Sequence, residues 1–538
     1  MKKNLFQNID VLVIGSGGSG LTAALEAKKS NVNVLVVSKT YPTHSQTCQA
    51  QGGINASREE SQEDIQSHIN DTLKGSHGLG SLEATKIMCQ NAPKTIKWLD
   101  TIGVPFSRDK ENKIAQRKFG AASKIRTCYS SDYTGLKILH SLYDNCIKEE
   151  IDFLNEYQLL DLIKENNKII GADFLCIKSS EVISIFAKTT ILATGGYSNI
   201  YNKFTTNSHA TTGDGVAAAL RAGAKLSNME MIQFHPTAMK GNNILISESA
   251  RGEGGYLVNK DEKRFIDELK PRDEVARAIY SKQIKNEEVF LDLRHIGEEK
   301  IDAVMPQERR LAKEFMNIDI TKELLPINPA AHYCMGGIKT NVSCETSLEN
   351  LYACGECSQV GIHGANRLGG NSLQEIITFG KIAGVNAANK SKSIQNSQSI
   401  LTKTHKSVKN YFTQDSTINF YEIKEDMGRA FFNNLGLFRN EEKIDSLIIQ
   451  VNKWKKDLKN MGIRDKSQFY NKNLVEFIEF KNMLELGEAV LLGAKMRKES
   501  RGAHFRTDFP VEKESLCKNS TIYKNSDETL SILFEDIT

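Results

Sequence analysis

Residues 10–30 read DVLVIGSGGSGLTAALEAKKS, and this stretch decides the fold. Residues 10–14 predict a buried parallel strand, residues 15–20 (GSGGSG) a tight turn, and residues 21–30 a helix. A second apolar strand is expected at residues 32–37. In this order of elements the N-terminus of the helix can hold a pyrophosphate, and glycines let the backbone approach it closely. The pattern therefore predicts a dinucleotide-binding unit, with Gly15, Gly17 and Gly20 at the pyrophosphate.

Further glycine-rich turns lie downstream of this unit. A strand-like run at 189–193 ends in ATGG, TTGDG precedes a helix-like stretch at 216–224, and a strand at 351–354 leads into Gly355-Glu356. After the second strand, where NAD enzymes usually carry an acidic residue, this chain has Ser38-Lys39, which argues for a different dinucleotide. We expect a discontinuous nucleotide-binding domain, with residues 1–237 as its first part, residues 345–395 as its second and an inserted domain at 238–344.

The remainder of the chain has a different character. After Lys390 the sequence is rich in Lys, Asn and Ser, and helical patterning follows. The apolar residues of one helical stretch fall near a single face, which is typical of a packed helical domain: Phe477, Phe480, Leu484, Leu491 and Ala494. We expect a helical domain at 396–510 and a short C-terminal tail at 511–538.

Composition narrows the class of protein. A chain of 538 residues should divide into two or three domains. Its 70 basic and 66 acidic residues are scattered, so nucleic acid is not an expected partner. The N-terminus shows no export signal, and no apolar stretch is long enough for a transmembrane segment. Ten cysteines without a signal peptide suit a reducing compartment, and Cys354 and Cys357 have no second pair at metal-ligand spacing, so no metal site is predicted.

Several longer motifs follow one another along the chain: SKTYPTHSQTCQAQGGI, ATGG, TTGDG, MEMIQFHPT, ISESARGEGGY, PRDEVARAI, HYCMGGI, LYACGECSQVGIHGANRLGGNSL and ESRGAHFRTDFP. Over residues 8–510 these motifs resemble the flavoprotein subunit of the succinate dehydrogenase and fumarate reductase family, to which L-aspartate oxidase is related. The resemblance implies an α/β fold, in which a discontinuous Rossmann-like FAD-binding domain carries an inserted α+β capping domain and is followed by a C-terminal helical domain.

The resemblance also implies FAD as the cofactor. Beside the three glycines of the first turn, it places Ser38 and Lys39 near the adenosine end. The residues expected by the isoalloxazine ring are Thr47, Gln51, Gly52 and Gly53, and the cradle is completed by Asp214, Glu356, Ser372 and Leu373.

The implied reaction is the interconversion of fumarate and succinate, with hydride transfer from flavin N5. A dicarboxylate needs fixed donors, and a planar guanidinium grips a carboxylate in a bidentate way. The residues implied as substrate ligands are His235, Ser247, His332 and Arg367. The family places the proton donor on the capping domain, where Arg272 matches, and Glu248 with Arg251 matches the relay that resupplies it. Without the resemblance, Arg272 would be interpreted as a structural partner of Glu248 or Asp273.

The chain departs from the family at the flavin attachment site. The family's SHT triplet supplies a histidine that bonds covalently to the flavin, but Gln46 occupies that position here, and His44 lies two residues upstream. We therefore expect noncovalent FAD with a lowered potential, which favours fumarate reduction. Ser247 replaces a threonine but keeps a hydroxyl, and Gly120-Ala121 stands where a double glycine is common, so that the added methyl group could narrow the site.

Electrons must come from outside, because the chain has no cysteine cluster for an iron–sulfur centre and no second dinucleotide unit. We expect an iron–sulfur subunit as partner and, through it, a membrane anchor. The protein is then expected in the cytoplasm, or held peripherally at the inner face of the cell membrane. L-aspartate oxidation, a soluble thiol-linked fumarate reductase and a flavin-binding scaffold without turnover remain as alternatives.

Overall fold

The strand predicted at residues 10–14 lies inside a seven-stranded sheet in the computed structural model, which describes residues 8–395 and 404–537. β1 (Ile9–Ile14) pairs in parallel with β2 (Val34–Ser38) on one side and with β9 (Val182–Leu192) on the other. The order is β6-β2-β1-β9-β8-β7, and β16 also pairs with β9. The remaining strands of this sheet are β6 (Asp152–Asn155), β7 (Tyr157–Glu165), β8 (Lys168–Cys176) and β16 (Leu351–Ala353).

β9 joins two kinds of pairing in one long strand. Its second half runs parallel to β1 and to β16, whereas its first half is antiparallel to β8. β16 belongs to the segment after the inserted domain, so two separate parts of the sequence complete one sheet. This pairing confirms the discontinuous Rossmann-like domain expected from the sequence.

The turn after β1 is held by close backbone contacts. Gly15 has a φ of 111°, and a Cβ there would lie 2.2 Å from the carbonyl oxygen of Ala193. A Cβ on Gly20 would lie 2.0 Å from the carbonyl oxygen of Gly15. Only glycine fits both places, so the chain can turn directly from the end of β1 into α1 (Gly18–Lys28).

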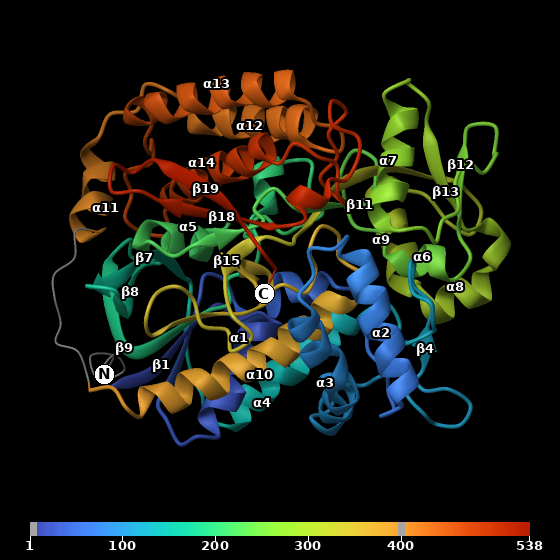
Figure 1. Ribbon diagram of the computed structural model, residues 1–538, viewed down its shortest axis with the longest axis horizontal. Coiled ribbons are helices and arrows are strands. Elements are labelled where there is room, and N and C mark those ends of the chain that lie inside the picture. Colours follow the sequence, from blue (N-terminus) through green and yellow to red (C-terminus); the bar gives the residue numbers. More distant parts are fainter. Residues whose placement is uncertain (1–7, 396–403, 538) are drawn as a thin grey trace.

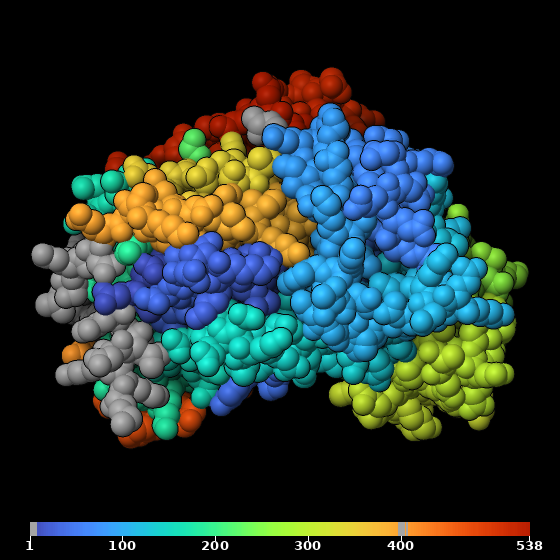
Figure 2. All heavy atoms as spheres, turned by 90° about the horizontal axis from the view of Figure 1, so that it is seen from below, coloured from blue at the N-terminus to red at the C-terminus, as the bar shows by residue number. Residues whose placement is uncertain are grey.

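One face of the sheet is covered by helices from distant parts of the sequence. α1 packs between α10 (Asn371–Ser391) and α4 (Thr134–Lys148), and Figures 1 and 2 show the three lying side by side. Two further helices, α2 (Gln62–Gly75) and α3 (Leu82–Thr101), pack beside them. A small sheet near them contains β3 (Ile54–Asn55), β5 (Thr127–Cys128) and β4 (Gln116–Arg117).

The helical domain packs on the opposite side, along the top of Figure 1. Its helices are α11 (Thr404–Thr413), α12 (Phe420–Leu435), α13 (Glu441–Asp457) and α14 (Lys472–Met496). The apolar residues expected to share one face of a helix are all buried on α14, which packs against α12, α13 and α5 (Asp214–Ala222). The expected start of this domain, residue 396, lies outside the described residues.

The inserted segment forms the lobe at the right of Figure 1. Its sheet has the order β11-β14-β13-β12, which the strands β11 (Ile232–Met239), β12 (Tyr256–Asn259), β13 (Val289–Asp292) and β14 (Leu325–Cys334) build. Its helices are α6 (Glu248–Gly252), α7 (Arg272–Gln283), α8 (Glu298–Val304) and α9 (Pro306–Met316). The lobe has its own apolar core, for instance Leu257, Val275 and Leu291.

Residues 511–538, expected to be a short tail, contain a hairpin instead. β18 (Asn519–Lys524) and β19 (Leu530–Glu535) pair with each other, and β18 pairs with β10 (Leu226–Ser227). The sheet is completed by β15 (Gly337–Lys339) and β17 (Ser358–Gln359). The hairpin escaped the sequence reasoning because β19 is only half-buried throughout and lacks a clear apolar alternation.

Short 3-10 helices connect these elements within the described ranges. They are η1 (Pro42–His44), η2 (Gln46–Gln49), η3 (Ser198–Tyr201), η4 (Arg294–Ile296), η5 (Gly355–Cys357), η6 (Leu458–Asn460) and η7 (Glu514–Leu516).

Gly20→Ala should destabilise the protein by ~1–3 kcal/mol, because the added methyl group would overlap the Gly15 carbonyl oxygen. Gly17→Ala is the matched control, since its nearest non-neighbouring atom would lie 3.4 Å away. Urea unfolding of the two apo-proteins provides the measurement. Equal stability of both variants would contradict the packing described for this turn.

Candidate active site

One elongated pocket collects almost all the residues singled out from the sequence. It lies between the glycine turn after β1 and the inserted lobe. The predicted residues that line it are Gly15, Gly17, Ser38, Lys39, Thr47, Gln51, Gly52, Gly53, Asp214, His235, Ser247, Glu248, Arg272, His332, Glu356, Arg367, Ser372 and Leu373. Gly20 and Arg251 do not line the pocket: Gly20 packs against Gly15, and Arg251 lies behind Glu248.

The end of the pocket at the glycine turn suits a pyrophosphate. The Ser16 and Ser38 hydroxyl oxygens are 2.6 Å apart, which ties the turn to the end of β2. The Gly18 N–H donates to the Thr47 hydroxyl oxygen at 3.0 Å. The N-terminus of α1 thus faces the cavity, and a dinucleotide has the anionic group that such a terminus attracts.

The wall of the pocket holds polar atoms that lack a partner. Ser45 Oγ, Gln51 Oε1, Thr194 Oγ1 and Arg367 Nε are buried and make no hydrogen bond. All four belong to residues that line the pocket. Buried polar atoms are normally satisfied, so these atoms indicate a ligand rich in hydrogen-bonding groups. FAD fits this donor and acceptor set at the place where the sequence predicts it.

Glu356 closes the cradle near Cys334. Its carboxylate accepts the Cys334 N–H at 3.0 Å, and burial raises its pKa to about 7. Gly196 lies so close that a Cβ there would be 2.5 Å from Glu356 Oε1. Glu356 can therefore act as either a donor or an acceptor toward a ligand near neutral pH.

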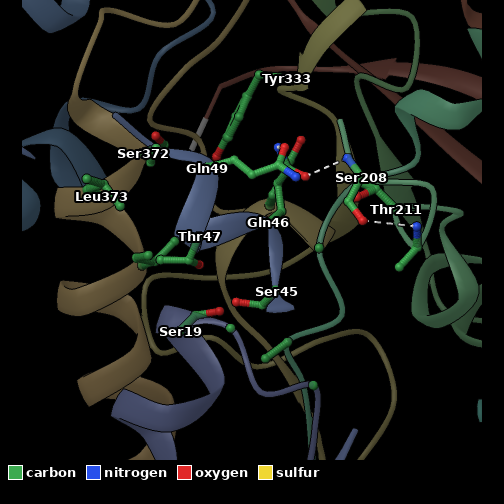
Figure 3. Close-up of a pocket in the computed structure, with 18 of the residues that line it drawn as sticks. Ser19, Ser45, Gln46, Thr47, Gln49, Ser208, Thr211, Tyr333, Ser372 and Leu373 are labelled. Carbon is green, nitrogen blue, oxygen red and sulfur yellow. Dashed lines mark hydrogen bonds between the residues drawn. The ribbon is translucent and has the colours of Figure 1, made fainter. Parts of the chain in front are cut away.

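Gln46, at the position of the family's histidine, points into the pocket from η2. Its Oε1 accepts the Ser208 N–H at 2.8 Å (Figure 3), and its Nε2 donates to Gln49 Oε1 at 3.2 Å. The side chain thereby links η2 to the loop around residue 208. His44 also lines the pocket but is exposed, and it lies against Tyr41.

The far end of the pocket is built around Arg272 and Glu248. Arg272 begins α7, and its Nε and Nη2 donate to Glu248 Oε2 at 2.7 and 2.5 Å. Glu248 begins α6 and also accepts the Gly120 N–H at 2.8 Å. Burial alone would raise the pKa of Glu248, but the charges of Arg272 and Arg251 lower it. Glu248 is thus a buried carboxylate held by cations.

Arg367 approaches this pair from the loop before α10. Its Nη2 donates to Gln233 Oε1 at 3.3 Å, and Arg272 Nη1 donates to the same oxygen at 3.1 Å. Its Nη1 donates to Ser372 Oγ, and its guanidinium lies 4.3 Å from the centre of the Tyr333 ring. Burial, with the nearby charge of Arg272, lowers the pKa of Arg367 to about 10.

Two histidines stand opposite the arginines. The rings of His235 and His332 have centroids 4.9 Å apart, and His332 Nδ1 lies 2.8 Å from the Thr206 hydroxyl oxygen. Burial first, and the charge of Arg272 second, lower the pKa of both imidazoles well below the usual value. Both rings are therefore neutral near pH 7, and the positive charge of the site comes from its arginines.

Ser247 and Arg251 flank Glu248 on α6. The Ser247 hydroxyl caps the helix by accepting the Ser249 N–H, and it lines the pocket. Arg251 is fully buried; its Nη1 donates to the Glu268 carbonyl oxygen at 2.5 Å, while its Nε and Nη2 have no partner.

Ala121, expected to narrow the site, does not line the pocket and is exposed, because its φ of 58° turns the chain away.

Gln233 and Tyr333 are the residues of this site that the sequence reasoning missed. Gln233 holds both arginines through one oxygen, and Tyr333 supports Arg367 with its ring while its hydroxyl donates to Glu375 at 2.9 Å. Both lie within motifs named above, QFHPT and HYCMGG: Gln233 is two residues before His235, and Tyr333 directly follows His332. The available signal was this adjacency alone, since an amide and a phenol have ordinary structural uses.

Comparison with known families agrees with this geometry. Residues 10–373 match the family described as FAD binding domain, and residues 424–538 match the family described as fumarate reductase flavoprotein C-term. The chain belongs to the fumarate reductase and succinate dehydrogenase flavoprotein family. FAD is its cofactor.

Relatives named fumarate reductase and relatives named succinate dehydrogenase are about equally similar to this chain. The 8-methylmenaquinol:fumarate reductase flavoprotein subunit of Wolinella succinogenes is 37% identical, over 98% of this chain and 90% of the relative. The succinate dehydrogenase flavoprotein subunit of Rickettsia conorii is also 37% identical, over 94% and 91%. A solved structure titled quinol-fumarate reductase with menaquinol molecules has a TM-score of 0.93 at 32% identity, and 98% of each chain is covered. Across the described residues, we find no helix with the length and apolarity to cross a bilayer.

The dissociation constant of a dicarboxylate should change little between pH 6 and pH 8. The lowered pKa values keep His235 and His332 neutral over this interval, and the pKa of Arg367, about 10, keeps it charged. An imidazole that carried charge at pH 6 would instead lose it as the pH rises, and binding would weaken. Calorimetry with malonate measures the constant. A rise of more than about threefold would contradict this assignment.

Proposed function

We propose that this flavoprotein interconverts fumarate and succinate and favours fumarate reduction. The observation that carries the proposal is the buried arrangement of Arg272, Glu248 and Arg367 around Gln233 at one end of the FAD pocket. The two arginines supply positive charge for the two carboxylates of a substrate. One of them, Arg272, is already paired with the buried carboxylate of Glu248.

The positive site suits a dianion. Arg367 retains an unpartnered Nε that can donate to one carboxylate of the substrate. Neutral His235 and His332 can donate N–H groups without adding charge, and the Ser247 hydroxyl reaches the same cavity. Because these donors come from different elements, they can hold both ends of a short, planar dicarboxylate and exclude water from between them.

When bound, FAD supplies the hydride that fumarate accepts at one olefinic carbon. Arg272 donates a proton to the other carbon, which balances the conversion of fumarate dianion to succinate dianion. A free guanidinium is a poor acid, so the proton must be replaced at once. Glu248, to which two N–H groups of Arg272 donate, returns the proton in this proposal, and Arg251, whose charge acts on Glu248, is the next group of the relay.

The direction of the reaction follows from Gln46. An amide cannot form the covalent bond that the family's histidine makes, and here it is used in the bond to Ser208. Noncovalent FAD lacks an electron-withdrawing link, so its lower potential favours giving electrons to fumarate. Fumarate reductase and succinate dehydrogenase relatives are equally similar to the chain, so sequence similarity does not favour either direction of the reaction. The proposed direction rests on the chemistry of Gln46.

We further propose an iron–sulfur subunit as electron donor and, through it, a membrane anchor that holds the protein at the inner face of the membrane. The relatives are named as flavoprotein subunits, which supports a multi-subunit setting. The described residues contain no cluster of metal-ligating side chains that could hold an electron-transfer centre.

Arg272→Lys should reduce fumarate turnover by at least ~10²-fold, because the ammonium keeps the charge but loses the planar fork and its reach. Glu248→Gln should also slow turnover, whereas Arg367→Lys should mainly weaken malonate binding. Dye-coupled fumarate reduction gives kcat, and L-aspartate oxidation is measured in parallel. The matched control is Arg277→Lys on the same helix, where Arg277 pairs with Asp273 and does not line the pocket. Parent-like turnover by Arg272→Lys, or aspartate oxidation that exceeds fumarate reduction, would overturn the assignment.

Acid precipitation should release FAD into the supernatant, since Gln46 cannot bond to it covalently. Gel fluorescence of the denatured chain provides the measurement, and Gln46→His is the comparison, because it restores the imidazole that the family uses. Flavin fluorescence that stays with the parent polypeptide would show that His44 or another residue forms the bond.

A further inference from the structure

Lys39 stands at the rim of the FAD pocket, directly after β2. Its ammonium donates to Thr212 Oγ1 at 2.9 Å, to Asp214 Oδ2 at 2.7 Å and to Glu479 Oε1 at 2.7 Å. A lysine ammonium has three N–H donors and no acceptor. These three partners use the full donor set, so Lys39 could bond to a phosphate or a ribose only by giving up one of them.

The charges around Lys39 also argue against a phosphate ligand. One ammonium faces two carboxylates, Asp214 and Glu479, and all three side chains are largely buried. Burial by itself would lower the pKa of Lys39, yet the two carboxylates raise it above the usual value. A cluster in which carboxylates outnumber the cation offers no net attraction to an anionic pyrophosphate.

Glu479 comes from the helical domain, far along the chain from β2. It lies on α14, and burial raises its pKa, so its charge depends on Lys39. One turn further, Asn482 Nδ2 donates to Asp214 Oδ1 at 2.9 Å. α14 therefore reaches the start of α5 with two side chains on one face, and Figure 1 shows α14 running above α5.

We infer that Lys39 anchors α14 of the helical domain to the rim of the FAD pocket through its bond to Glu479, a contact that we call the pin. Glu479 is then a positioning residue for FAD retention. Through this contact, α14 holds Asp214 and the end of β2 in place, and both belong to the cofactor wall. α14 itself contributes no residue to the pocket lining. FAD binding and docking of the helical domain are then coupled, since each stabilises the same rim. This inference rests on FAD binding and is independent of the proposed reaction.

A double-mutant cycle on the apo-protein tests the pin. Lys39→Met, Glu479→Gln and the double variant should each lower the urea midpoint of the apo-protein and raise the dissociation constant for FAD by about tenfold, measured by quenching of flavin fluorescence. The double variant should bind FAD no more weakly than either single variant, because both remove one interaction. Glu476→Gln is the matched control: it lies on the same helix and pairs with exposed Lys472, and its FAD affinity should equal that of the parent.

Direct contact between Lys39 and FAD would give a different pattern. Lys39→Met would then weaken FAD binding, Glu479→Gln would leave it and the apo stability unchanged, and the inference would be overturned. Hydrogen exchange of the unmodified protein supplies a readout that needs no variant. FAD should slow amide exchange in α14 around residues 479–486, although these residues do not line the pocket. Unchanged exchange there would also overturn the pin, and neither experiment uses fumarate.

Discussion

Two buried guanidinium groups share a single acceptor, and much of the molecule is arranged to keep them together. Gln233 Oε1 accepts from Arg272 and from Arg367. Arg272 also donates to the Glu248 carboxylate, and Arg367 also donates to Ser372 Oγ. Like charges in a water-poor site repel strongly, and the lowered pKa of Arg367 reflects its burial first and the charge of Arg272 second. The cluster survives because β11, α6, α7 and the loop before α10 each fix one member, so the inserted lobe and the nucleotide-binding domain must stay docked.

Features with a local physical signature could be predicted from the sequence. Gly15 and Gly20 are needed where backbone atoms approach closely, and residues 10–14 had to be buried on both sides. The site residues were found through motifs, since a histidine or arginine in isolation carries little information. What could not be predicted depends on partners brought together by folding. Nothing near Lys39 in the sequence indicates Glu479, and nothing near Gln233 shows that its oxygen would face two arginines.

The noncovalent attachment proposed from Gln46 would change how the cofactor is retained. A covalent bond makes retention independent of the surrounding conformation, whereas a noncovalent ligand is held only while its whole binding surface is assembled. In this chain the Gln46 amide instead bonds η2 to the loop around Ser208, so it stabilises the wall of the pocket and leaves the ligand without a covalent bond at this position. With the noncovalent FAD proposed above, retention depends on domain packing, and it should respond to conditions that loosen the lobe or the helical domain.

The hairpin at the C-terminus has a consequence for the order of events during synthesis. β18 supplies the partner for β10, with Ile522 opposite Leu226, and Ser520 bonds to buried Glu230. A ribosome adding about 5–20 residues per second needs roughly 15–60 s to pass from one strand to the other. During that interval β10 has an open edge, and Glu230 lacks both Ser520 and its ion-pair partner Arg497. The nascent N-terminal half is therefore exposed to misassembly until β18 is made and pairs with β10, and a version truncated before residue 519 would stay permanently in that state.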